Sequence, residues 1–300
     1  MIADKFVDLY ARNSGLRDKL IAERDVVLTY ALRALLDTGT MRHLAFKGGT
    51  CLRKLVFGSA GRFSEDLDFT LDSTLSGDDV LTEVVEVFNH EHFGIRFKFD
   101  EYYITDDGTS FGGDVLYHHS WNSEGRFRLQ ISLRERPTLP VIVKSMQHQA
   151  YFPYLEFELF GIRSLEPTEM IAEKIRAAFQ RAKVRDLYDL YRFSTRPFDI
   201  ELIRRLAVLK LWQVQDPFDP ENFFLKIRSG IYDWEDIRRL VKTSERIDPE
   251  EIISSVEKRF ATLRHLSKLE QQLIADAKSG RNTTLAEQLR SDIHGRFTPS

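Results

Sequence analysis

Residues 46–70 read FKGGTCLRKLVFGSAGRFSEDLDFT. Gly48 and Gly49 carry no Cβ atom, so the backbone at this pair can come close to a ligand. The residues from Thr50 to Leu55 have the pattern of a helix start, and the N–H groups at such a start suit phosphate oxygens. The first half of the stretch therefore predicts a turn that binds phosphate groups.

The second half of the stretch contains two acidic residues, Asp66 and Asp68, on either side of an apolar one. They begin a pattern typical of a strand, in which alternate side chains face the same side. Two neighbouring carboxylates repel each other unless a cation lies between them, and Mg²⁺ with substrate phosphates is the usual cation. A phosphate-binding turn beside a metal site is what phosphoryl or nucleotidyl transfer requires. Asp-x-Asp pairs also occur on solvated strand ends, but the glycine pair, Arg62 and Ser64 favour the metal site.

Two motifs in this stretch, KGGTCL at 47–52 and GRFSEDLDF at 61–69, resemble the AbiEii/AbiGii family of nucleotidyltransferase toxins, which includes the mycobacterial MenT enzymes. The resemblance implies an α+β protein with a polymerase-β-like nucleotidyltransferase core, a mixed sheet with helices, followed by an all-helical C-terminal domain. It implies that Asp66 and Asp68 are catalytic and carry Mg²⁺. It also implies a nucleotide-binding set made of Lys47, Gly48, Gly49, Thr50, Arg62 and Ser64.

A second motif, EPTEMIAEKIRAAFQRAKVRDLYDLYRF at 166–193, predicts a strong helix after Pro167. Lys174 lies on the apolar face of this helix, where a lone ammonium group is costly without an anionic partner. A nucleotide phosphate is one candidate partner, and Asp189 or another carboxylate is the other. The motif is similar to a block of the same family, which implies that Lys174 contacts the triphosphate and that Asp189, or else Asp186, completes the active site.

The same block contains three basic residues that the resemblance assigns to RNA binding, namely Arg181, Lys183 and Arg185. An alternative reading makes Asp186 and Asp189 simple partners of Arg185 and Arg192 on the same helix. Both readings are open at this point.

One position departs from the family pattern. Residues 127–133 alternate as a strand, and in polymerase-β-like folds the strand beside the two aspartates commonly provides a third carboxylate. This chain has Gln130 there. An amide is a weaker magnesium ligand than a carboxylate, so fewer charges hold the metal, another acid substitutes, or a second ion binds weakly.

The composition predicts a soluble, globular protein. The 300 residues are 42% hydrophobic and 30% charged, and no apolar run reaches the length of a membrane span. The only cysteine, Cys51, excludes an internal disulfide and fits the reducing cytoplasm, and we expect it to be an inert buried thiol. We expect a nucleotidyltransferase core at 1–163 and a helical domain at 164–300 that carries Lys174 and Asp189.

The net charge of −3 hides an uneven distribution. Residues 51–110 contain five Lys and Arg against thirteen Asp and Glu, whereas 160–212 contain eleven against seven and 126–149 five against one. An acidic nucleotide site with basic flanks suggests a nucleic-acid substrate. Ordinary solvated helix faces would give a similar pattern.

Two further expectations concern helices. Residues 16–37 have apolar positions at helical spacing, and we expect Arg24 and Asp25 to be ordinary surface or capping residues on that helix. Beyond Pro197 the chain is predicted to be almost wholly helical, with one long helix from Pro249 to Ser279.

The motifs predict transfer of a nucleoside monophosphate from a nucleoside triphosphate (NTP) with Mg²⁺, and the family resemblance implies a toxin whose acceptor is the 3′ end of tRNA. The resemblance implies that a cognate antitoxin neutralises it. Two alternatives stay open: a small-molecule, antibiotic-modifying nucleotidyltransferase, and a catalytically weakened nucleotide-binding or antitoxin-docking module, which Gln130 favours.

Overall fold

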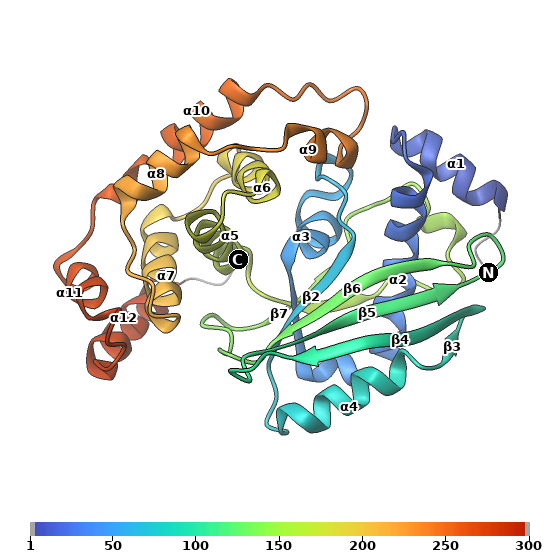
Figure 1. The fold of residues 1–300 in the computed structure, drawn as a ribbon, viewed down its shortest axis with the longest axis horizontal. Helices are drawn as coiled ribbons and strands as arrows, with labels where there is room; N and C mark the ends of the chain where they lie inside the picture. The colour runs from blue at the N-terminus through green and yellow to red at the C-terminus, as the bar shows by residue number, and fades with distance from the viewer. Residues whose placement is uncertain (1–3, 298–300) are drawn as a thin grey trace. The chain divides into compact units, whose positions relative to one another are not determined.

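The computed structural model describes residues 4–297, which form two compact units (Figure 1). The first unit contains the residues up to Leu165 together with Arg238–Glu245, and the second contains Glu166–Ile237 and the residues from Arg246 onward. No helix in the described part of the chain is long and apolar enough to cross a membrane.

The first unit is built around one eight-stranded sheet with the strand order β3-β4-β5-β6-β2-β1-β8-β7. The strand β2 runs parallel to β6 and antiparallel to β1, and β1 runs parallel to β8, so the sheet is mixed. The predicted α+β class is confirmed. The strands are β1 (Leu44–Lys47), β2 (Asp66–Leu71), β3 (Glu91–His92), β4 (Ile95–Ile104), β5 (Ser110–His118), β6 (Gly125–Ser132), β7 (Ile142–Ser145) and β8 (Gly161–Ser164).

The helices of this unit cover one face of the sheet. Figure 1 shows α2 passing behind the strands and α4 below them. Buried residues alternate with exposed ones along β6 and along the first half of β4. This alternation is what a sheet with one covered and one open face requires. The helices are α1 (Asp4–Ser14), α2 (Lys19–Asp37), α3 (Gly48–Cys51) and α4 (Gly77–Val87), with the short turns η1 (Thr40–His43), η2 (Leu52–Phe57), η3 (Gly58–Ala60) and η4 (Phe152–Tyr154).

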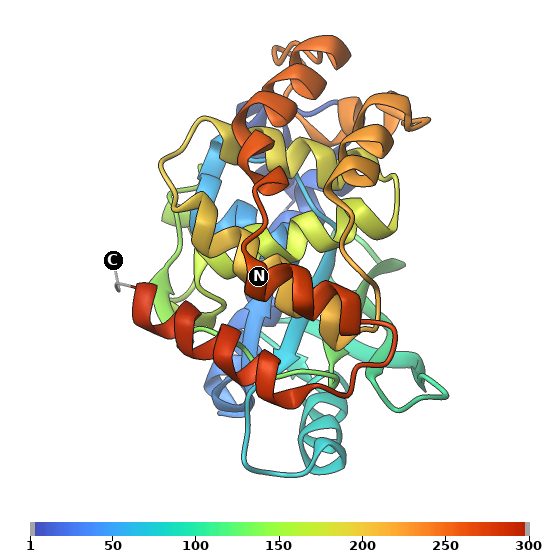
Figure 2. The ribbon, with the colours of Figure 1, turned by 90° about the vertical axis from the view of Figure 1, so that its left-hand side faces the viewer.

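The described residues of the second unit form helices and connecting segments without a strand, as predicted (Figure 2). The helices α7, α8 and α10 begin after an Asp whose side chain accepts backbone N–H groups, and in α8 and α10 a proline follows it directly, which is a strong start signal. The helices are α5 (Pro167–Gln180), α6 (Val184–Ser194), α7 (Ile200–Gln213), α8 (Pro220–Ser229), α9 (Trp234–Leu240), α10 (Pro249–Phe260), α11 (Lys268–Asp276) and α12 (Thr283–Arg296), with η5 (Ala261–Arg264); the last residues of α9 belong to the first unit.

The prediction of one helix from Pro249 to Ser279 was wrong. The helix α10 ends at Phe260, and α11 starts afresh at Lys268. The cause is a capping box, in which the Ser267 side chain accepts the N–H of Glu270 and the Glu270 carboxylate accepts the N–H of Ser267. The Glu270 carboxylate is also buried against Arg204, which fixes the break in place.

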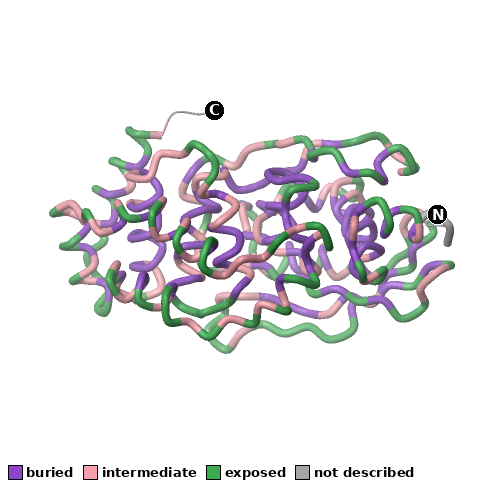
Figure 3. Tube along the Cα trace, turned by 90° about the horizontal axis from the view of Figure 1, so that it is seen from above, coloured by how far each residue is buried: buried purple, intermediate pink, exposed green. Residues whose placement is uncertain are grey.

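Buried residues are interspersed with exposed ones in both units (Figure 3). The helix α2 is mostly buried, with thirteen of its nineteen residues inside, and α7 is similar with ten of fourteen. Three of the thirteen in α2 are polar, namely Glu23, Asp25 and Thr29. The prediction that Asp25 lies at the surface was therefore wrong, since its exposed fraction is 0%.

Candidate active site

The glycine pair lies where β1 ends and α3 begins. Gly48 has a φ of +78°, a backbone conformation that favours glycine. A Cβ atom at Gly48 would lie 2.1 Å from Oδ2 of Asp68, and one at Gly49 would lie 2.6 Å from Nη2 of Arg62 and 2.8 Å from Oγ of Ser64. Both glycines are thus required by the side chains that lie against them, and the turn brings together residues that are up to 20 positions apart in sequence.

The two acidic residues share one face of β2. Asp66 and Asp68 are half-buried, whereas Leu67 and Phe69 between and after them are fully buried in the core. This is the alternation that the sequence predicted. Since Asp68 lies against Gly48, the carboxylate pair and the glycine turn form one site.

Gln130 occupies the predicted neighbouring position. In the parallel pairing of β2 with β6 it lies opposite Asp68, and Arg128 lies opposite Asp66. The Gln130 amide nitrogen donates a hydrogen bond to the hydroxyl of Tyr103 (3.2 Å). Among the described residues, no group of three or more His, Cys, Asp or Glu side chains could hold a metal ion. The site therefore offers two carboxylates and an amide.

The other side chains of the turn are largely buried. Arg62 and Ser64 each have an exposed fraction of 5%, and Arg62 donates to the backbone carbonyl of Phe63. The Thr50 hydroxyl donates to the backbone carbonyl of Asp66, so it links α3 to β2. Cys51 is fully buried, and burial raises the pKa of its thiol, which agrees with the predicted inert thiol.

Lys174 in the second unit lies between two carboxylates. Its Nζ is 3.0 Å from Oδ1 of Asp186 and 2.7 Å from Oδ2 of Asp189. Burial raises the pKa of Asp186, but the charges of Lys174 and Arg181 outweigh this and lower it to about 2. Of the two candidate partners for Lys174, the structure shows the carboxylates, and both predicted aspartates of α6 contact the predicted lysine of α5.

The three basic residues assigned to RNA binding differ in their surroundings. Arg185 makes a bidentate ion pair with Asp236 (2.6 and 2.7 Å), and Arg181 pairs with Asp186 (2.9 Å). Lys183 is exposed and immediately precedes α6. Arg181 and Arg185 thus have anionic partners within the second unit.

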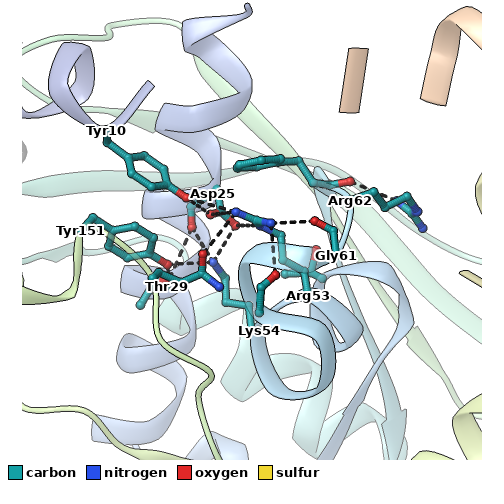
Figure 4. Close-up of polar contacts among 12 residues, drawn as sticks. Tyr10, Asp25, Thr29, Arg53, Lys54, Gly61, Arg62 and Tyr151 are labelled. Carbon is teal, nitrogen blue, oxygen red and sulfur yellow. Dashed lines mark hydrogen bonds and ion pairs between the residues drawn. The ribbon is translucent and has the colours of Figure 1, made fainter. Parts of the chain in front are cut away.

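The sequence analysis missed a buried ionic network that adjoins the site in the first unit (Figure 4). Asp25 of α2 contacts both Arg53 (3.1 Å) and Lys54 (2.8 Å) of η2. The two basic residues have exposed fractions of 2% and 1%. The sequence does indicate that these two charges are buried. Arg53 and Lys54 interrupt a helix whose other residues are apolar, namely Leu52, Leu55, Val56 and Phe57.

Comparison with known proteins places this geometry in a family. Residues 30–278 match the sequence profile of the family described as "Nucleotidyl transferase AbiEii toxin, Type IV TA system". The chain belongs to this family. The toxin is therefore a nucleotidyltransferase of a type IV toxin–antitoxin system, and the predicted family and enzyme class are confirmed.

The solved structure of MenT4 agrees with the family assignment. The toxin is similar to MenT4, a nucleotidyltransferase toxin from Mycobacterium tuberculosis H37Rv, with 28% sequence identity, a TM-score of 0.83, and coverage of 98% of this chain and 99% of MenT4. JHP933 from Helicobacter pylori has 19% identity and a TM-score of 0.47 over 89% of this chain and 98% of its own. A comparison with curated protein sequences finds no match.

Proposed function

We propose that this toxin transfers a nucleoside monophosphate from an NTP to the 3′ end of tRNA in the cytoplasm, using Mg²⁺, and that a cognate antitoxin neutralises it. One observation carries the proposal. The carboxylates Asp66 and Asp68 share a face of β2, Asp68 lies against Gly48, and Arg62 and Ser64 lie against Gly49. Acidic groups for a cation thus adjoin hydrogen-bond donors for an anion, which is the charge pattern that NTP chemistry needs.

The residues fit a magnesium ion. Mg²⁺ is usually held by one or two carboxylates together with substrate phosphates, and Asp66 and Asp68 provide the carboxylates. The nitrogen of Gln130 donates to Tyr103, so its amide oxygen is the atom that suits a cation. When bound, the ion would neutralise charge on the phosphates and on the attacking hydroxyl. A side chain at residue 48 would overlap with Asp68, which supports a role for the glycine in keeping this carboxylate in place.

The donors around Gly49 suit the triphosphate. The Arg62 guanidinium and the Ser64 hydroxyl both face the Cα of Gly49, where they can donate to phosphate oxygens. The proposal also assigns Lys47 and Thr50 to this nucleotide site. From the family resemblance it assigns Lys174 to the triphosphate, and Asp189, or else Asp186, to the completion of the active site.

The open face of the sheet supports a nucleic-acid acceptor. Lys98 and Arg126 lie in one cross-strand row through Leu116, and Arg128 lies in the next row, opposite Asp66. Their side chains have exposed fractions of 71%, 69% and 55%, respectively. Exposed basic groups next to the carboxylate pair would attract the phosphates of an RNA strand. This face is a further candidate for RNA contact besides Arg181, Lys183 and Arg185.

A transfer assay with one matched pair of variants tests the function. Purified toxin is incubated with total tRNA, Mg²⁺ and each radiolabelled NTP separately. Asp66→Asn should reduce labelling of tRNA at least about a hundredfold, because the lost carboxylate held the metal. Asp78→Asn is the control, since Asp78 is an exposed acidic residue of the same unit, in the first turn of α4 and outside the sheet.

The remaining outcomes separate the alternatives. Equal labelling by wild type and Asp66→Asn would rule out the assigned site. Labelling of a small cationic acceptor but not of tRNA would identify a small-molecule enzyme. NTP binding by calorimetry without transfer to any acceptor would identify the weakened nucleotide-binding module.

A further inference from the structure

The helix α2 is linked to both ends of the segment that carries Arg62 and Ser64, directly at one end and through Arg53 at the other. We call residues 58–65 the Arg62 loop; it connects η2 to β2. Two adjacent residues of α2 are involved. Asp25 acts on the first half of the loop through Arg53, and Arg24 acts on its last residue, Glu65.

The Arg53 guanidinium has several hydrogen-bond partners outside the Arg62 loop. Its Nε donates to Asp25 (3.1 Å), and its Nη2 contacts Asp25 (3.3 Å), Tyr10 (3.2 Å) and Gln149 (3.2 Å). All of these partners lie outside the Arg62 loop. The guanidinium is therefore oriented by α1, α2 and the segment before η4, independently of the loop itself (Figure 4).

The remaining face of Arg53 meets the Arg62 loop. Its Nη1 donates to the carbonyls of Gly61 (2.9 Å) and Gly58 (3.4 Å), and its guanidinium lies 3.4 Å from the centre of the Phe63 ring. Gly61 and Phe63 are the two neighbours of Arg62 in the chain. Arg53 thus fixes the backbone before Arg62 and the side chain after it.

The far end of the loop is fixed by two ion pairs of Glu65. Glu65 lies directly before Asp66, and its carboxylate contacts Arg24 (2.6 Å) and Arg239 (2.9 Å). In addition, the N–H of Phe63 donates to the carbonyl of Leu240 (2.7 Å). The loop is therefore held on both sides of Arg62 and Ser64.

Stability alone is a poor explanation for this arrangement. Burying charged groups is costly, and well-packed apolar residues of similar volume are often as stabilising as a buried ion pair. A buried guanidinium does offer five N–H groups in a fixed plane, which can align several acceptors at once. We infer that Asp25 and Arg53 are positioning residues, which hold the Arg62 loop so that Arg62 and Ser64 face Gly49. The consequence for nucleotide binding rests on the proposed function.

Two neighbouring substitutions test the inference. Arg53→Lys keeps a positive charge beside Asp25, but an ammonium cannot reach Asp25 and the loop carbonyls together. Lys54→Met is the matched control, because the Lys54 ammonium contacts Asp25 and Tyr151 in the same network, and both of these residues lie outside the loop. Arg53→Lys should bind Mg²⁺–NTP about tenfold more weakly in calorimetry, whereas Lys54→Met should keep the wild-type affinity.

A second measurement does not depend on nucleotide. Hydrogen exchange of the free protein should show faster exchange at residues 59–65 in Arg53→Lys, and wild-type exchange there in Lys54→Met. If Arg53→Lys lowers the melting temperature but leaves both loop exchange and NTP affinity unchanged, its role is structural only and the inference is overturned. If the wild type itself binds no NTP, the proposed function fails, and the exchange result alone decides the positioning role.

A milder variant covers the case in which Arg53→Lys does not fold. Glu65→Gln removes the charge at the other end of the loop, where the side chain is 15% exposed. We expect faster exchange at the same residues and a smaller loss of NTP affinity, about threefold. Unchanged exchange in Glu65→Gln would overturn the two-sided positioning.

Discussion

Replacement of Lys54 should change how the stability of the toxin depends on pH. Lys54 is fully buried, and its Nζ contacts the carboxylate (2.8 Å) and backbone carbonyl (2.7 Å) of Asp25 and the hydroxyl of Tyr151 (3.0 Å). Burial lowers the pKa of Lys54 to about 8, although the Asp25 charge opposes this. The network holds two cations for one carboxylate, so Lys54 is the group that loses its proton more easily.

The direction of this pH dependence follows from the number of protons that the folded and unfolded chains bind. Between about pH 8 and the ordinary lysine pKa of about 10.4, the unfolded chain keeps a proton that the folded chain has released. The free energy of unfolding therefore rises with pH in this window through Lys54, and this contribution is lost as pH falls through about 8. The interval between the two pKa values corresponds to about 3 kcal/mol of stability.

Lys54→Met removes this dependence. At pH 7 the variant no longer buries a costly ammonium, but three acceptors lose a donor at about 1–2 kcal/mol each. We expect the two proteins to lie within about 2 kcal/mol of each other at pH 7. From pH 8 to 10, the wild type should gain up to about 3 kcal/mol relative to the variant.

Urea unfolding at several pH values between 7 and 10 measures this difference. Only the difference between the free energies of unfolding of the two proteins is informative. Burial raises the pKa of Cys51, Tyr10 and Tyr151, and these groups reduce stability at high pH in both proteins. Parallel stability profiles for wild type and Lys54→Met would refute the reasoning.

Three further predictions concern the site and the second unit. Gly48→Ala should displace Asp68 and weaken Mg²⁺ and NTP binding in calorimetry at least tenfold, whereas Gly108→Ala, which has a similar positive φ but open space around its Cα, should not. Lys174→Met should leave two buried carboxylates without this cation and lower the free energy of unfolding of the second unit by about 3–5 kcal/mol, read from its melting curve; an unchanged curve with weaker NTP binding would instead indicate a purely ligand-binding lysine. Arg126→Glu should weaken tRNA binding and reduce its salt dependence while NTP affinity stays constant, and equal RNA affinity would remove the open sheet face from the proposed interface.

Local patterns predicted the parts of the site that depend on short-range geometry. The alternation around Asp66 and Asp68 gave their shared face, and the glycine pair indicated close approach, although only the structure shows that the approaching groups are Asp68, Arg62 and Ser64. The position of Gln130 beside Asp68 followed from the fold that the family resemblance implied.

The wrong placement of Asp25 and the missed ionic network have one physical cause. Hydrophobic periodicity assumes that charged residues face water, so it placed Asp25 at the surface; in fact α2 is buried on nearly all sides and Asp25 meets charges from residues 53 and 54. The partners lie 28 and 29 positions away, and no local pattern reports such a pairing. The break before α11 was different, because Ser267 and Glu270 form a capping signal that is visible in the sequence.

The return of residues 238–245 to the first unit affects how this toxin can be divided into fragments. A polypeptide that stops near residue 165 would retain every strand of the sheet, yet it would lack Leu240, which accepts the N–H of Phe63, and Arg239, which pairs with Glu65. Such a truncated chain would have an intact sheet but a poorly anchored loop. Loss of activity on truncation would then not prove that the helical region takes part in chemistry, and adding residues 238–245 back as a separate peptide would distinguish the two explanations.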